Sequence, residues 1–252
     1  MGGAIARGLA SGTIIKAEEL TVTAHTQKTL DKLSEDVEGI KTTLNNAEAV
    51  KDAEIVMLAI KPWLIKNIIE EIKPSLNLSK QMIVSIVAGI SCDEIKEMLG
   101  DKNATIFRVI PNTAISIKQS PTLMCSSNAS QEQIACIKSL FDELGQAFIL
   151  EERLMAAGTA ITSRGIAYAF EYIKAAIQAA IELGFYPHVA KAMIDQTVMG
   201  AASLLEKNGT MPDAEIYKVC TPGGITIKGL NEMSAQGFDN AVIAGLKKAA
   251  GK

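Results

Sequence analysis

Two threonines near the carboxyl end of the chain have a spacing that could bind a small polar ligand. Thr221 and Thr226 flank Pro222-Gly223-Gly224, and a helical-looking run follows at 227–233. Proline fixes one backbone angle, and two glycines let the chain pass close to a bound molecule. We expect Thr226 to be the helix N-cap, where free N–H groups favour a carboxylate. A capped turn between two helices explains the same residues, so spacing alone leaves both interpretations open.

The elements that must position such a loop differ between the two halves of the chain. In residues 1–150, strands are expected at 20–24, 55–60, 82–87, 105–109 and 123–125, with helices at 27–33, 65–72 and 93–99. Nearly all-apolar strands that alternate with helices are typical of a parallel sheet covered on both faces. We therefore predict an α/β domain over residues 1–150.

Residues 151–252 carry no further strand signal and are predicted to be all-helical. A long helix is expected at 154–183, interrupted only by Gly165 and ended by Gly184. Pro187 suits the first turn of a second helix that runs to about residue 206. Both helices are apolar on more than one face, which predicts burial against a second subunit and hence a homodimer or a larger homo-oligomer.

The composition of the chain argues against several classes of function. The 252 residues have a formal charge of −3, no basic stripe, no apolar run of membrane-spanning length and no signal peptide, so we expect neither a nucleic-acid nor a membrane partner. The two histidines lie far apart in the sequence, so we expect neither a His-based metal site nor a His general base. The four cysteines lack CxxC spacing and are interpreted as buried thiols of a cytoplasmic protein; they are Cys92, Cys125, Cys136 and Cys220.

Several motifs occur in the order typical of one family. The run Cys-Thr-Pro-Gly-Gly-Ile-Thr-Ile-Lys-Gly-Leu at 220–230 resembles the signature of pyrroline-5-carboxylate reductases. Ser-x-x-Ala-Gly-x-Ser at 85–91, Arg-x-Ile-Pro-Asn-Thr at 108–113 and Thr-Ser-Arg-Gly-Ile-Ala-Tyr at 162–168 are similar to further family motifs. The resemblance implies a Rossmann-like nucleotide domain, a helical dimerisation domain and reduction of pyrroline-5-carboxylate to L-proline, the last step of proline synthesis.

The resemblance also implies a nucleotide site at the strand ends. It assigns cofactor contacts to Gly2, Gly3, Thr26, Asn46, Ala59, Lys61, Pro62, Ala88 and Gly89. Gly2 would be the last glycine of the dinucleotide fingerprint, whose strand and first two glycines would lie upstream of Met1, so we expect a weakened nucleotide site. No acidic residue occurs at 22–28, which favours NADP while leaving NAD possible.

For the substrate, the resemblance assigns a hydrogen bond from Thr226 to the ring nitrogen, and contacts from Thr221, Gly223 and Gly224 to the carboxylate. Two alternatives remain open. One is another imine or β-hydroxyacid dehydrogenase with a catalytic lysine, for which Lys174 is the one candidate at 154–183. The other is a non-catalytic binding protein with a damaged nucleotide site. Arg164 is unexpected and could be an interface residue or a carboxylate ligand.

Overall fold

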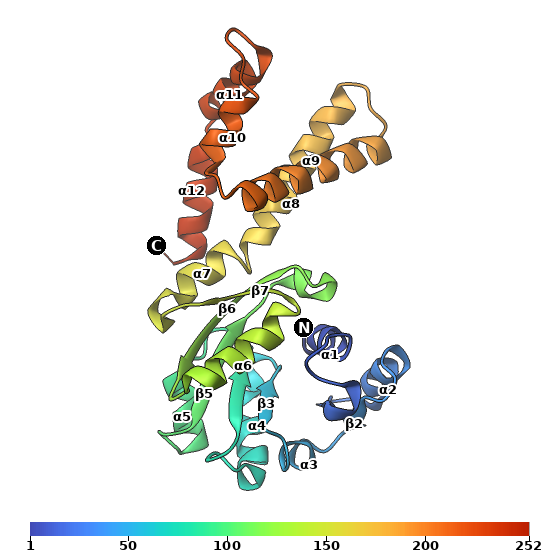
Figure 1. The fold of residues 1–252 in the computed structure, drawn as a ribbon, viewed down its shortest axis with the longest axis vertical. Coiled ribbons are helices and arrows are strands. Elements are labelled where there is room, and N and C mark those ends of the chain that lie inside the picture. Colours follow the sequence, from blue (N-terminus) through green and yellow to red (C-terminus); the bar gives the residue numbers. More distant parts are fainter. Residues whose placement is uncertain (252) are drawn as a thin grey trace. The chain divides into compact units, whose positions relative to one another are not determined.

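The computed structural model describes residues 1–251 and divides into two compact units, Met1–Ser163 and Arg164–Lys252 (Figure 1). The first is a mixed α/β unit and the second is helical, which confirms the predicted fold class. In chain order, with η for 3₁₀ helices, the first unit contains α1 (Gly2–Ala10), η1 (Ala17–Glu19), β1 (Thr21–Thr23), α2 (Gln27–Asp36), β2 (Lys41–Thr43), α3 (Asn46–Val50), β3 (Ile55–Leu58), η2 (Pro62–Leu64), α4 (Ile65–Ile72), η3 (Lys73–Ser75), β4 (Met82–Ser85), α5 (Cys92–Leu99), β5 (Thr105–Ile110), η4 (Thr113–Ile117), β6 (Ser120–Ser127), α6 (Gln131–Asp142), β7 (Gly145–Ile149), η5 (Glu152–Leu154) and α7 (Met155–Ile161).

The larger sheet of this unit has the strand order β3-β4-β5-β6-β7. The pairs β3–β4 and β4–β5 are parallel, as predicted, and so is β6–β7. The pair β5–β6 is antiparallel, so the expectation of an all-parallel sheet is wrong at this pair. The reason is the short connection through η4, because a parallel return needs a crossover of a dozen or more residues.

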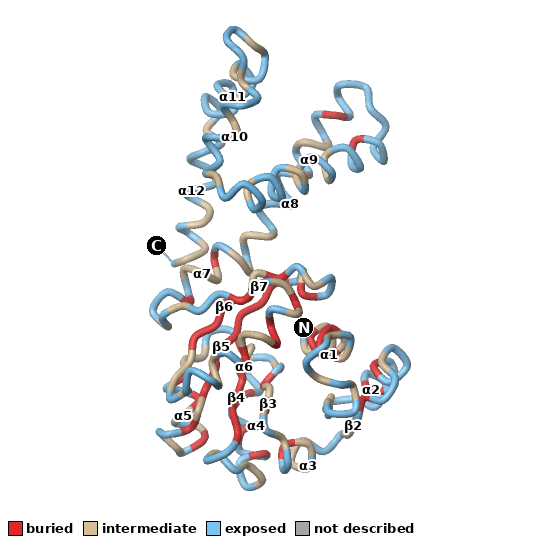
Figure 2. The backbone as a smooth tube through the Cα atoms, in the orientation of Figure 1, coloured by how far each residue is buried: buried red, intermediate tan, exposed pale blue. Residues whose placement is uncertain are grey.

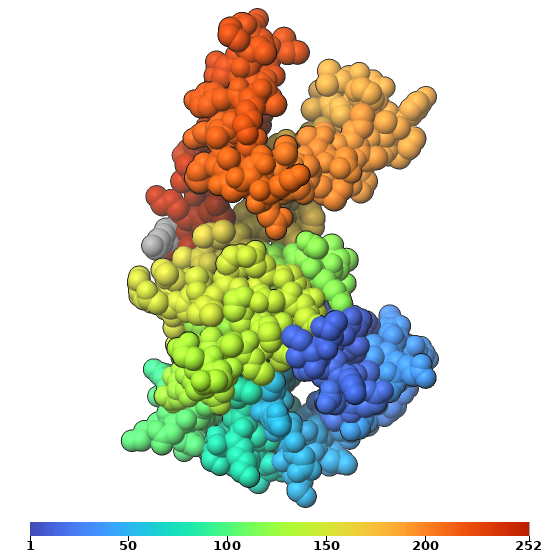
Figure 3. All heavy atoms as spheres, viewed as in Figure 1, coloured from blue at the N-terminus to red at the C-terminus, as the bar shows by residue number. Residues whose placement is uncertain are grey.

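A second, two-stranded sheet lies apart from the first. β1 pairs in parallel with β2, and among residues 1–251 neither strand pairs with β3. Consequently β1 and β3 each have one edge without a hydrogen-bonded neighbour strand. Figure 3 shows an opening between the blue atoms of the N-terminal segment and the cyan atoms near β3 and α4.

Helices bury both faces of the larger sheet. Ile69 of α4 and Ile95 of α5 belong to the cluster on one face, and Ile5 of α1 and Phe141 of α6 belong to the cluster on the other. Figure 2 shows the buried residues concentrated along β4, β5 and β6. Capping supports this packing, because Ser91 accepts a hydrogen bond from the Glu94 N–H at 3.2 Å and starts α5 soon after β4 ends.

The first unit extends beyond the boundary expected at residue 150. Met155 of α7 is buried in the same cluster as Leu123 and Cys125 of β6. A side-chain carbon added at Gly158 would lie 2.7 Å from Leu123, so the helix packs tightly on the sheet. The segment 151–163 is thus held by the sheet, and the compact division falls after Ser163.

The second unit consists of α8 (Gly165–Glu182), α9 (Pro187–Asn208), α10 (Pro212–Lys218), α11 (Ile225–Ala235) and α12 (Phe238–Ala249). The expected long helix at 154–183 is two helices, because α7 ends at Ile161 and α8 starts at Gly165. Pro187 begins α9 as predicted. Of the residues that the structure describes here, only Ala180 and Ala190 are buried (Figure 2).

No helix among the described residues combines the length and the apolar character needed to cross a membrane.

Candidate functional site

The residues expected to hold the nucleotide lie where four strands of the first unit end. They follow β1, β2, β3 and β4 in turn, and they are Thr26, Asn46, Ala59, Lys61, Pro62, Ala88 and Gly89. Open α/β sheets bind ligands at the carboxyl ends of their strands. Within each of the two parallel pairs, β1–β2 and β3–β4, these ends therefore fall on one edge.

The first turn of α1 meets the end of β3. A side-chain carbon added at Gly2 would lie 3.0 Å from Cβ of Ala59. The helix begins at Gly2 without a side-chain cap, so its first N–H groups lack intrahelical acceptors. Gly2 and Ala59 thus meet at a helix end whose dipole favours an anion such as phosphate.

The turns after β3 and β4 are open. Lys61 is exposed and precedes η2, in which Pro62 takes the first position. Gly89 has a φ of +81°, a left-handed conformation that favours glycine, and no atom within 4 Å of a carbon added there. Ala88 and Gly89 are both exposed, so the end of β4 leaves room for a ligand beside the backbone.

Asn46 and Thr26 already have side-chain partners. Asn46 donates through Nδ2 to Glu71 Oε1 at 3.1 Å, which ties α3 to α4. The hydroxyl of Thr26 lies 2.9 Å from that of Thr29 in the first turn of α2. A ligand that binds either side chain has to replace or share these contacts.

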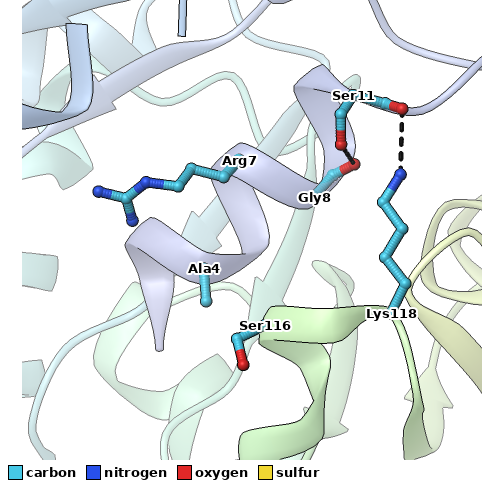
Figure 4. A pocket seen from close by; sticks show the side chains of 6 residues that line it. All are labelled: Ala4, Arg7, Gly8, Ser11, Ser116 and Lys118. Carbon is cyan, nitrogen blue, oxygen red and sulfur yellow. Dashed lines mark hydrogen bonds between the residues drawn. The ribbon is translucent and has the colours of Figure 1, made fainter. Parts of the chain in front are cut away.

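A pocket of about 170 Å³ lies elsewhere on α1, between this helix and η4 (Figure 4). Its two cations are engaged, because Arg7 forms an ion pair with Asp36 at 2.7 Å and Lys118 donates to the Ser11 carbonyl at 3.0 Å. The lining contains none of the residues expected to bind the cofactor. We therefore place the candidate nucleotide site at the strand ends and not in this pocket.

The Thr221–Thr226 loop has a specific reason for each of its glycines. Gly223 has a φ of +74°, in the left-handed region. A carbon added at Gly224 would lie 2.6 Å from Thr221 Oγ1, so this hydroxyl packs directly on the glycine. The Gly224 N–H donates to the Thr221 carbonyl at 2.9 Å and closes the turn. The glycines therefore bring the Thr221 hydroxyl to the start of α11.

The prediction that Thr226 is the N-cap of this helix is wrong. Gly224 takes the N-cap position, α11 begins at Ile225, and Thr226 is its second residue. Pro222 and the two glycines let the chain turn into the helix sooner than the apolar pattern indicates. The Thr226 hydroxyl is thus free of a capping role, and it is exposed in a first turn whose N–H groups lack intrahelical acceptors.

Glu215 stabilises the segment that leads into this loop. Its Oε1 accepts hydrogen bonds from Lys218 Nζ at 2.7 Å, from Thr210 Oγ1 at 2.6 Å and from Asn208 Nδ2 at 3.1 Å. Lys218, Thr210 and Asn208, in that order of effect, lower the pKa of Glu215 to about 2. This carboxylate therefore holds the α9–α10 turn and the end of α10 together.

Two family models match the chain. Residues 152–252 match the family of pyrroline-5-carboxylate reductase dimerisation, and residues 1–89 match the family described as NADP oxidoreductase, coenzyme F420-dependent. Pyrroline-5-carboxylate reductase 2 of Dictyostelium discoideum is 31% identical over 266 residues, which cover 100% of this chain and 88% of that protein. The chain belongs to the pyrroline-5-carboxylate reductase family.

Two further comparisons describe the extent of the likeness. Pyrroline-5-carboxylate reductase 1 of D. discoideum is 34% identical over 98% of this chain, which spans only 46% of that relative's length. The crystal structure of Plasmodium falciparum pyrroline carboxylate reductase with NADP bound has a TM-score of 0.87 at 26% identity, covering 99% of this chain and 92% of that one. The fold and family of the chain are those of a nucleotide-dependent oxidoreductase.

Membership in this family argues against the alternative of another imine or β-hydroxyacid dehydrogenase. Two basic residues, Lys174 and Arg164, had open roles in the sequence, and the structure shows their contacts. Lys174 of α8 is exposed and forms an ion pair with Glu171 at 2.5 Å, one helical turn away. Arg164 donates from Nη1 to the Ala249 carbonyl at 2.7 Å. It therefore ties the start of α8 to the end of α12, where a cation also complements the helix dipole.

The reductase fold also brings together residues that the sequence pattern did not connect. Arg108 of β5 donates from Nη1 to Glu152 Oε1 at 2.6 Å, and Cys92 lies beside Cys125. The expectation that all four cysteines are buried is wrong for Cys136, which is exposed, and for Cys220, which is half-buried. Antiparallel pairing of β5 with β6 creates the Arg108–Cys125 neighbourhood, and no local spacing signals it.

Proposed function

We propose that the chain reduces 1-pyrroline-5-carboxylate to L-proline with NADPH, and that the loop from Thr221 to Thr226 binds the substrate. The observation that carries this proposal is the construction of the loop. Its glycines place a hydroxyl against the start of α11, and an exposed threonine follows in the first turn. Backbone N–H groups at such a helix start favour a small carboxylate, and the two hydroxyls add directional hydrogen bonds.

The strand-end residues of the first unit fit a dinucleotide. The uncapped start of α1 at Gly2 and the left-handed turn at Gly89 offer backbone N–H groups and close approach. We assign cofactor binding to Gly2, Gly3, Thr26, Asn46, Ala59, Lys61, Pro62, Ala88 and Gly89. NADP is favoured over NAD because no carboxylate follows β1 between residues 22 and 28, while His25 and Lys28 are exposed there. The NADP bound to the P. falciparum relative supports the same choice.

The residues of the loop orient the substrate. When bound, the reduced nicotinamide supplies the hydride that the imine carbon accepts. The Thr226 hydroxyl hydrogen-bonds the ring nitrogen and fixes the ring orientation, since a threonine is too weak an acid to be the proton source. Thr221 and the N–H groups of Gly223 and Gly224 hold the carboxylate. A protonated imine accepts hydride readily, so position and electrostatics are what the protein must add.

We further propose a homodimer joined through the helical unit. Large apolar side chains are exposed along its helices, such as Phe170 at 58%, Met199 at 56% and Ile243 at 57%. Exposed apolar surface of this extent marks an interaction face, and obligate interfaces commonly bury more than about 2,000 Å². The match of residues 152–252 to a dimerisation family supports the same assignment.

Replacement of Thr226 tests the substrate assignment. Thr226→Ala should lower kcat/KM for pyrroline-5-carboxylate by roughly 10- to 100-fold, because one orienting hydrogen bond is worth about 1.5–3 kcal/mol. Stability should change little, since Gly224 and not Thr226 occupies the cap position. Thr226→Ser keeps the hydroxyl and should retain most of the activity.

Three results would each count against part of the proposal. Unchanged kinetics in Thr226→Ala would remove Thr226 from the site. Loss of thermal stability in that variant would assign it a structural role. A wild-type chain that binds NADPH in a fluorescence titration with Trp63, but turns over no substrate, would favour the non-catalytic binding protein.

A further inference from the structure

Two buried cysteines of the sheet unit lie next to each other. Cys92 is the first residue of α5 and is 0% exposed, and Cys125 lies in β6 and is 3% exposed. Their sulfur atoms and a carboxylate oxygen of Glu152 all lie within 4.8 Å of one another. Residues far apart in the sequence thus form a compact dithiol.

The charges around the dithiol favour a reactive sulfur at Cys125. Arg108 is paired opposite Cys125 across β5 and β6, and its buried Nε has no acceptor. The neighbouring Cys92 thiol lowers the pKa of Cys125 and Arg108 acts in the same direction, whereas burial and Glu152 oppose them. The same sulfur–sulfur contact raises the pKa of Cys92. Cys125 is therefore the more readily ionised thiol of the two.

We propose that Cys92 and Cys125 form a reversible redox pair, which a small hydroperoxide closes into a disulfide. This inference concerns neither the substrate loop nor the strand-end site and goes beyond the reductase activity. Glu152, whose side chain is 38% exposed, has a carboxylate oxygen within 4.8 Å of both sulfur atoms, so the pair lies close to the surface of the unit.

The chemistry balances with hydrogen peroxide as the oxidant. The Cys125 thiolate attacks one peroxide oxygen, the O–O bond breaks, and a sulfenic acid and a hydroxide form; the hydroxide takes up the proton that Cys125 released when it ionised and becomes the first water. The Cys92 sulfur then attacks the sulfenic sulfur, the S–O bond breaks, and the departing hydroxide takes the Cys92 proton as a second water. Two thiols lose two electrons and two protons in total, and the peroxide is reduced to two waters.

A metal site is the competing interpretation of the same three residues. Glu152 Oε1 already accepts hydrogen bonds from Arg108 Nη1 at 2.6 Å and from the Cys92 N–H at 2.9 Å. A divalent cation at this point would lie beside the Arg108 charge, and two thiolates with one carboxylate are fewer ligands than a closed structural zinc site has. A disulfide is uncharged and leaves the Arg108–Glu152 ion pair in place. The geometry therefore favours sulfur–sulfur chemistry.

The bond would connect the start of α5 directly to β6. It would close the chain between residues 92 and 125, so it restrains the unfolded sheet unit and joins two of its core elements. Oxidation should raise the Tm of this unit by about 5–10 °C. Reduction with dithiothreitol should reverse the change.

The test uses the full chain, reduced and then exposed to hydrogen peroxide. Non-reducing peptide mass spectrometry should find one cross-linked species that joins the Cys92 and Cys125 peptides, and two thiols should be lost from the wild type. Cys136→Ser, which removes the exposed thiol, should behave like the wild type. Cys92→Ser should yield no cross-link and no rise in Tm.

Two results would overturn the proposal, and the first needs no variant. Oxidation confined to Cys136, or cross-links only between chains, would mean that the buried pair is inert. Binding of Co²⁺ by the reduced chain, with thiolate-to-metal absorption that disappears in Cys92→Ser, would assign the cluster to a metal instead.

Discussion

The two units of the chain differ in how far their large apolar side chains are exposed to solvent. In the sheet unit, Phe107 is 0% exposed and belongs to a cluster formed by helices and strands of the same unit. In the helical unit, Phe170 has the same side chain but is 58% exposed, and Tyr172 of α8 contacts Phe238 of α12 with ring centroids 6.4 Å apart. A single sequence thus contains a sheet unit with its own core and a helical unit whose described residues form no buried apolar cluster.

This difference separates two sources of stability. The sheet unit buries apolar residues on both faces of a five-stranded sheet, so its folding free energy comes from contacts within one chain. Helices that are apolar on several faces gain comparable free energy only when another surface covers them. The stability of the helical unit should therefore depend on protein concentration, and that of the sheet unit should not.

The largest expected effect is on the free energy of unfolding. It is tested by making the same substitution, Phe→Ala, in each of the two units. Phe107→Ala should destabilise the sheet unit by about 3–5 kcal/mol, because it leaves a cavity between β5 and its covering helices. The loss, measured by denaturant unfolding, should be the same at low and high protein concentration. Phe170→Ala should give a smaller loss that varies with concentration. Equal and concentration-independent losses would mean that the helical unit folds alone.

The next effect concerns assembly. Met199→Lys combined with Ile243→Lys places two charges on the exposed apolar surface of α9 and α12. The monomer–dimer dissociation constant should rise at least about 100-fold, which corresponds to roughly 2.7 kcal/mol. Trp63→Lys is the matched control, since Trp63 is 75% exposed but lies in the sheet unit. Sedimentation should detect dissociation only in the double variant, and dissociation in the control would place the interface elsewhere.

Much of the fold could be predicted from local patterns. The helix at 65–72 was expected at the bounds that α4 has, and Pro187 correctly marked the start of α9. These features depend on apolar periodicity, a proline at a first turn and glycine stops, which neighbouring residues determine. The motif at 220–230 likewise identified the family, because it combines rare residue types over a continuous segment.

Other features depend on distant residues and could not be predicted in this way. The direction of β6 follows from the length of the η4 connection, and it places Cys125 opposite Arg108. The ion pair of Arg108 with Glu152 joins residues 44 positions apart, and the Cys92–Cys125 pair requires α5 and β6 in place. The N-cap was misplaced for a local reason, since Thr226 is a better cap by type than the glycine that takes the position.

The smallest expected effect is on the pH dependence of stability. It concerns two carboxylates, one in each unit, that each hold a loop. Glu143 of the sheet unit accepts from the hydroxyl of Thr13 at 2.7 Å, and its pKa is lowered by the backbone N–H and then the hydroxyl of Thr13. Glu215 of the helical unit has three donors, and its pKa is lowered to about 2. Both side chains therefore stabilise the native state in their ionised form.

The sign of the pH dependence follows from these lowered pKa values. A carboxyl whose folded pKa is below its unfolded value of about 4.3 contributes fully above that value, and its contribution is lost as the pH falls towards the folded pKa. Glu215→Gln should therefore lower Tm by at most about 3 °C between pH 5 and 8, since its partner Lys218 is exposed and solvent screens the pair. This difference should shrink steadily from pH 4 towards pH 2. Glu143→Gln should behave in the same sense in the sheet unit. Thermal melts of the wild type and Glu215→Gln across this pH range test the prediction. A Tm difference that stays constant down to pH 2.5 would show that the charge of Glu215 is not what holds the turn.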